Sequence, residues 1–180
     1  AAVVAFTVVV VAAGPVHAQG PDMREQYTAD FETMMNKFKE LAAAMAPDQY
    51  DWRPMEGVRS VSEVFMLIVA ENYVVPAAWG ATPPEGITPS FALFEELPAN
   101  VTEKADVVAA LDRSSACLLE ELGKLTQSQM TETIRMFGQE GVLGSSLLLV
   151  SGDMHEHLGQ AIAYARMNEV VPPWSARQSQ

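Results

Sequence analysis

Four long segments of the chain repeat apolar residues at intervals of three and four, and no segment alternates apolar and polar residues convincingly. The segments cover about residues 22–45, 60–76, 103–122 and 142–168, with a polar connection at 126–140 before the last. Intervals of three and four place apolar side chains on one face of an α-helix, whereas a half-buried strand requires alternation. Four amphipathic helices bury their apolar faces by packing together. We therefore predict an all-α protein, a four-helix bundle without strands.

Local signals define where these helices begin and how they are joined. Ser60 and Glu63 are spaced as in a capping box, in which each side chain binds the other residue's backbone amide. Asn100 or Thr102 is expected to cap the third helix. Residues 80–98 are rich in proline and glycine, so we expect a long connection between the second and third helices.

The beginning of the chain has the features of a targeting segment. Residues 1–13 are apolar apart from Thr7, and a small-x-small pattern ends at Ala18. We expect residues 1–18 to be a signal peptide shortened at its start, followed by the bundle (residues 19–174) and a flexible tail (175–180). This interpretation predicts export to the periplasm or the extracellular space. An uncleaved membrane anchor is the alternative, although the apolar run is shorter than the roughly 20 residues that span a bilayer.

Charge and cysteine content exclude several classes of function. The net charge is −12 and no cluster of Lys and Arg occurs, so we expect no binding to nucleic acid or to anionic lipid surfaces. Cys117 is the only cysteine, which rules out an intramolecular disulfide, and we expect it to be a small buried apolar residue. A small-molecule ligand and a second copy of the chain, giving a homodimer, stay open as partners.

The fourth segment contains residues that could bind a metal ion. Asp153 and His157 are four residues apart, so their side chains share one face of a helix. In the alternative interpretation His157 is a partly buried imidazole that is hydrogen-bonded to Asp153 and oriented by Gln160 or Tyr164. His155 lies two positions from His157, about 200° around the helix, and should face away as a surface residue.

Two stretches of the chain resemble the DinB-like family in content, order and spacing. The first stretch is Asp51-Trp52-Arg53-Pro54 followed by Gly57-Val58-Arg59-Ser60-Val61-Ser62-Glu63-Val64. The second is Glu156-His157-Leu158-Gly159-Gln160-Ala161-Ile162-Ala163-Tyr164-Ala165-Arg166, closing with Val171-Pro172-Pro173-Trp174-Ser175. The resemblance covers most of the mature chain and implies a four-helix bundle. Many members hold zinc or nickel with three histidines, one on the second helix and two on the last, and some transfer or isomerise thiol adducts.

Carrying that site over to this chain gives an incomplete set of ligands. The two last-helix histidines fall on Asp153 and His157, and the second-helix histidine falls on Leu67. An aspartate can replace a histidine as a zinc ligand, but a leucine cannot. Glu71, one turn beyond Leu67, could supply an oxygen, although a helix carboxylate is more often on a solvated face. The resemblance therefore predicts a weak zinc or nickel site.

Three functions follow from these observations. The first is an exported DinB-like protein that is non-catalytic or of unassigned activity, with a degraded metal site in the bundle. The second is a metal-dependent thiol S-transferase or isomerase that uses an altered Asp153/His157 site. The third is a structural module that dimerises through helix faces. Glu71, Gln160 and Tyr164 are the side chains expected to line a ligand pocket.

Overall fold

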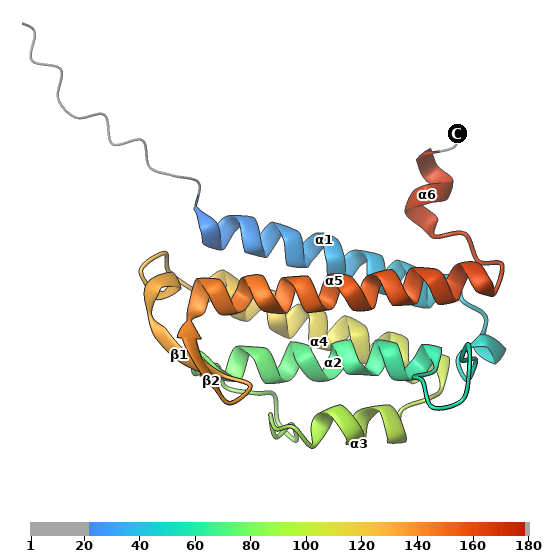
Figure 1. Cartoon of the computed structure of the whole chain (residues 1–180), viewed down its shortest axis with the longest axis horizontal. Helices are drawn as coiled ribbons and strands as arrows, with labels where there is room; N and C mark the ends of the chain where they lie inside the picture. Colours follow the sequence, from blue (N-terminus) through green and yellow to red (C-terminus); the bar gives the residue numbers. More distant parts are fainter. Residues whose placement is uncertain (1–21, 179–180) are drawn as a thin grey trace, which may run out of the picture.

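A computed structural model describes residues 22–178 of the chain. The four long helices are α1 (Met23–Ala44), α2 (Val61–Ala77), α4 (Lys104–Lys124) and α5 (Leu143–Met167). The shorter elements are η1 (Pro47–Gln49), α3 (Leu93–Asn100), η2 (Gln129–Thr131), the strands β1 (Thr133–Met136) and β2 (Gln139–Val142), and α6 (Pro173–Gln178). Figure 1 shows the four long helices side by side, with α3 beside α2 and the hairpin at one end.

The predicted four-helix bundle is confirmed. Helix α2 packs against α4 and α5, and α1 packs against α4 and α5. Apolar side chains at the predicted intervals form the core, and Phe38 and Phe65 meet edge to face with ring centroids 6.5 Å apart. Helix α2 is buried on nearly every side, because α3 covers a face that the other long helices leave open.

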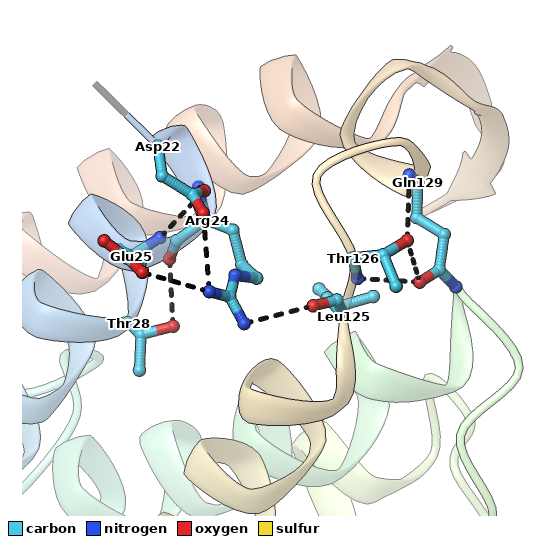
Figure 2. Close-up of polar contacts among 7 residues, drawn as sticks. All are labelled: Asp22, Arg24, Glu25, Thr28, Leu125, Thr126 and Gln129. Atoms are coloured by element: carbon cyan, nitrogen blue, oxygen red, sulfur yellow. Dashed lines mark hydrogen bonds and ion pairs between the residues drawn. The ribbon is translucent and has the colours of Figure 1, made fainter. Parts of the chain in front are cut away.

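The ends of α1 are bound to the two ends of α4. At its start, Arg24 pairs with Asp22 and donates to the carbonyl oxygen of Leu125, just past α4 (Figure 2). At its end, the Lys104 ammonium donates to the carbonyl oxygens of Ala43 and Met45, at 2.8 and 2.6 Å. These contacts hold α1 and α4 antiparallel, and Lys104 satisfies carbonyl groups that a helix end leaves without partners.

One predicted cap is present and one is wrong. The Glu63 amide donates to Ser60 Oγ at 3.3 Å, and the Ser60 amide donates to Glu63 Oε2 at 2.6 Å, as the capping box predicted. Helix α4 is instead preceded by Glu103, which makes no side-chain cap, so neither Asn100 nor Thr102 has the expected role. Asn100 belongs to α3, where its amide donates to the carbonyl oxygen of Glu96.

The prediction of no strands is also wrong. The polar connection before α5 forms an antiparallel hairpin in which Thr133 pairs with Val142 and Met136 with Gln139. Phe137 and Gly138 form its turn with positive φ angles of 49° and 79°, as a type I′ turn requires. Four-residue strands with mostly exposed side chains carry too little alternation to be recognised from the sequence.

The structure tests the prediction for the C-terminal end of the chain but not the prediction for its N-terminal end. The expected signal peptide, residues 1–18, lies outside the described residues. Part of the expected flexible tail is helical, as α6, and Arg177 pairs there with Glu40 at 2.9 Å. None of the helices within residues 22–178 combines the length and the apolar character needed to cross a membrane.

Candidate metal centre

Glu71, Asp153 and His157 come together between α2 and α5. Each offers one ligand atom, and these atoms all lie within 4.8 Å of one another. The Nε2 atom of His157 is 3.6 Å from Oδ2 of Asp153. Helical spacing places Asp153 and His157 on one face of α5, and the packing of α2 on α5 adds Glu71. We refer to these three residues as the triad.

The triad lies at the edge of the core, with one buried member. Glu71 is 5% exposed, whereas the side chains of Asp153 and His157 are 57% and 20% exposed. Burial and, next, the adjacent Asp153 carboxylate raise the pKa of Glu71 to about 9, against a smaller lowering by Arg59. Its Oε2 atom has no hydrogen-bond partner within the part of the chain that the structure describes. At neutral pH Glu71 therefore carries a proton that a cation could replace.

A chain of polar contacts orients the imidazole of His157. Its Nδ1 atom is 3.3 Å from Oε1 of Gln160, and the Gln160 amide donates to the Tyr164 hydroxyl at 2.9 Å. The Tyr164 ring packs edge to face on Trp52, with centroids 5.3 Å apart. When Nδ1–H donates to Gln160, the lone pair of Nε2 is left for a ligand, which is the arrangement that metal-binding histidines use.

His155 lies on another face of α5 and takes no part in the triad. Its Nε2 atom is 3.0 Å from Oδ1 of Asp30 on α1, and the buried Ser151 hydroxyl donates to Oδ2 of the same aspartate at 2.6 Å. His155 is therefore a surface residue that faces α1, as its spacing from His157 predicted.

The structure makes Glu71, rather than residue 67, the candidate metal ligand on α2. Both are buried, and both contribute with Asp153 to the wall of one pocket. Of the two alternatives for Glu71, a carboxylate that supplies an oxygen and one on a solvated face, the second is wrong, because Glu71 is buried. Residues 67 and 71 share a helix face, so the sequence could not decide which of them is nearer to His157.

The triad adjoins an open pocket of about 840 Å³. Two triad members, Glu71 and Asp153, line it, whereas Gln160 and Tyr164, which are linked to His157 by hydrogen bonds, are absent from its wall. Most of the remaining wall is apolar and comes from three segments around the triad: Phe91 and Phe94, Met136 and Phe137, and Leu149 and Val150. The arrangement suits a small molecule held beside a metal ion.

Cys117 lies apart from the triad, at a separate pocket formed with Gly80 and Lys124. Its side chain is half-buried, rather than fully buried as expected, and it packs on the core. Burial, followed by the charges of Glu121 and Glu120, raises the pKa of the thiol. A raised pKa disfavours the thiolate, so Cys117 has no features of a nucleophile.

The sequence and the fold are both similar to known proteins. The family model for the DinB superfamily matches residues 30–161. A DinB-like protein from Bacillus cereus has a TM-score of 0.69 and 14% identity, with 83% of this chain and 95% of that chain covered. A DinB-like protein from Bacillus subtilis, YjoA, has a TM-score of 0.61 and 22% identity, covering 81% of this chain and 93% of that chain.

A third similar structure has a functional description. YfiT from Bacillus subtilis, described as a probable metal-dependent hydrolase with an unusual four-helix bundle topology, has a TM-score of 0.65 and 15% identity. The match covers 88% of this chain and 95% of that chain. None of the curated proteins matches the chain significantly. At these identities the structural likenesses establish the fold alone.

Proposed function

The chain belongs to the DinB superfamily, and on that premise we propose that it is a metal-dependent hydrolase in which Glu71, Asp153 and His157 hold a divalent ion. The observation that carries the proposal is Glu71, a buried carboxyl with an unpaired oxygen, placed against the two α5 residues. Two carboxylates and one imidazole form a ligand set that zinc or nickel accepts, and three protein ligands leave further positions open.

The surroundings of Glu71 fit a cation. A buried carboxyl group without full hydrogen bonding is costly, so native proteins usually pair such a group or use it. Replacement of the Glu71 proton by a divalent ion would satisfy the free oxygen and offset the repulsion from Asp153. With Glu71 in place of the absent second-helix histidine, the site has three ligands. We therefore propose tighter binding than the two-ligand expectation.

The reaction is inferred from the surroundings of the triad. When bound, the ion supplies Lewis acidity to a substrate in the adjoining pocket. Gln160 holds the orientation of His157, and the apolar pocket wall displaces water around the bound molecule. The description of YfiT as a probable metal-dependent hydrolase supports hydrolysis. Thiol transfer would use the same ion, but export, which residues 1–18 support, would separate the protein from mainly cytoplasmic thiols.

Metal analysis tests this proposal directly. Protein purified without a metal-affinity tag should contain about one zinc or nickel ion per chain, and calorimetric titration of the metal-free protein should give the same stoichiometry. Glu71→Gln keeps the size of the side chain and should weaken binding by at least about 100-fold, since the buried ligand is lost. Glu140→Gln, an exposed carboxylate of the same pocket, is the matched control.

The result that would overturn the proposal is equally specific. Equal zinc affinities for the parent, Glu71→Gln and Asp153→Asn would show that the triad is not the binding site. If the ion binds at the triad but a chelator does not reduce hydrolysis of any ester or amide in a substrate panel, the metal site stands and the hydrolase assignment fails.

A further inference from the structure

Three phenylalanine side chains gather on one side of the pocket beside the triad. Phe91 precedes α3, Phe94 lies on α3 and Phe137 lies in the hairpin turn, and their ring centroids are 6.0 to 6.2 Å apart. We refer to them as the aromatic cluster. Phe91 is 64% exposed and Phe137 42%, although exposed aromatic surface costs free energy in water.

The backbone of the hairpin turn is strained at Phe137. Phe137 has a φ of 49°, in the left-handed region where glycine and asparagine are favoured and bulky side chains are uncommon. A small residue there would form the same type I′ turn with less strain. Turn formation alone would favour a small residue at position 137, yet the chain places a phenylalanine there, and its side chain lines the pocket. This indicates that Phe137 contacts a ligand.

Arg59 is the only cation among the described residues that line the pocket. Arg59 directly precedes the N-terminal cap of α2, at the end of that helix far from the hairpin (Figure 1). Its exposed guanidinium makes no hydrogen bond and no ion pair with the residues that the structure describes, and its charge reaches Glu71. A free guanidinium presents a planar fork of donors that matches a carboxylate.

Two acidic side chains of the pocket lie near the aromatic cluster rather than near Arg59 in the sequence. Glu95 and Glu140 also line the pocket, and each is close in sequence to a member of the aromatic cluster, Phe94 or Phe137. The pocket wall therefore has negative charge next to the aromatic cluster and a free cation on a separate segment, directly before α2. A divalent ion bound by the triad would neutralise the two carboxylates near Arg59, and in the metal-free protein solvent screens the charge of Asp153, whose side chain is 57% exposed.

We infer that this pocket binds an amphiphilic monocarboxylate, with its carboxylate on Arg59 beside the triad and its aliphatic or aromatic tail on the aromatic cluster. The inference rests on the proposed function in taking this pocket as the place where the reacting molecule lies. It adds the substrate class, a molecule with one carboxylate and an apolar tail. The size of the pocket, about 840 Å³, is within the range of small-molecule sites.

The test compares three probes that share a ten-carbon tail: decanoate, decanol and decylammonium. Calorimetric titration of the full chain, freed of metal by a chelator, should show decanoate binding most tightly. Arg59→Gln should weaken decanoate binding about ten-fold or more and leave decanol unchanged, because the lost contact involves the carboxylate alone. Arg166→Gln, an exposed arginine of α5 outside the pocket, is the matched control. Phe91→Ser should weaken decanoate and decanol alike.

Each contrary outcome overturns the inference. Equal affinities for decanoate and decanol, or an unchanged decanoate affinity in Arg59→Gln, would show that no anion site exists. Tighter binding of decylammonium would assign the head group to Glu95 and Glu140 instead. Because the titrations use metal-free protein, loss of decanoate binding with intact zinc binding contradicts only this inference, and loss of zinc binding with intact decanoate binding contradicts only the proposed function.

Discussion

The buried carboxyl of Glu71 on α2 lies within 4.8 Å of the ligand atoms of Asp153 and His157, one turn apart on α5. Glu71 and Asp153 are thus two carboxyl groups in contact, one enclosed and one open to solvent. Like charges this close do not ionise together without a counter-charge, so one of them retains a proton or both share a cation.

The stability of the metal-free protein should depend on pH through Glu71. Its pKa is raised from an ordinary value of 4.5 to about 9 in the folded state. The folded state therefore binds this proton more tightly, and the resulting stability is complete below about pH 4.5 and is lost as the pH rises towards 9. We expect the free energy of unfolding, measured with urea, to fall by a few kcal/mol over that interval, since each tenfold difference in proton affinity is worth about 1.4 kcal/mol.

Glu71→Gln isolates this contribution. The amide cannot ionise, so the variant should show a much weaker decline over the same interval, whereas Glu140→Gln, exposed on the hairpin, should follow the parent. Parallel pH profiles for Glu71→Gln and the parent would contradict the raised pKa.

Zinc binding should release protons from the triad. At pH 7 the Glu71 carboxyl is protonated, and a divalent ion must displace that proton before the oxygen can bind. Calorimetric titrations in two buffers with different ionisation enthalpies should give about one proton released per ion. Glu71→Gln should release fewer protons, and release of none by the parent would place the ion elsewhere.

A histidine at position 67 should replace the function of Glu71. Leu67 and Glu71 share one face of α2 and line the same pocket, so an imidazole at position 67 could reach the site. We expect Leu67→His to restore zinc binding when it is combined with Glu71→Gln. Leu67→Met in the same background should not restore it, because it repacks the position without adding a nitrogen ligand. Equal zinc affinities for the two double variants would show that position 67 is too far from His157.

The cluster around Asp30 should stabilise the fold without affecting the metal. Asp30 accepts from the buried Ser151 hydroxyl at 2.6 Å and lies 3.0 Å from His155. Asp30→Ala should lower the free energy of unfolding by about 1–3 kcal/mol, because the buried hydroxyl loses its acceptor. Adding Ser151→Ala should recover part of that loss. His155→Ala should leave zinc affinity unchanged, and a loss of zinc binding would make His155 a ligand.

The sequence determined the helices and much of their arrangement. Apolar intervals of three and four residues predict which face of each helix is buried. The contacts between Ser60 and Glu63 span a single helical turn, so this cap can also be predicted from the local sequence. The hairpin could not be predicted in this way. Its strands are short and mostly exposed, and Phe137 occupies a turn position that a glycine or asparagine would have revealed.

The same division applies to the site. Asp153 and His157 are one turn apart on a single helix, so their shared face follows from helix geometry alone. Which turn of α2 meets them depends on how far α2 and α5 slide past each other, and that offset is set by side-chain packing along the whole interface. The tertiary structure placed Glu71 there and buried it, and burial beside Asp153 changed its pKa. The sequence by itself therefore determined two candidate ligands and the helix that carries them, whereas packing between helices distant in sequence decided the third candidate ligand and its protonation.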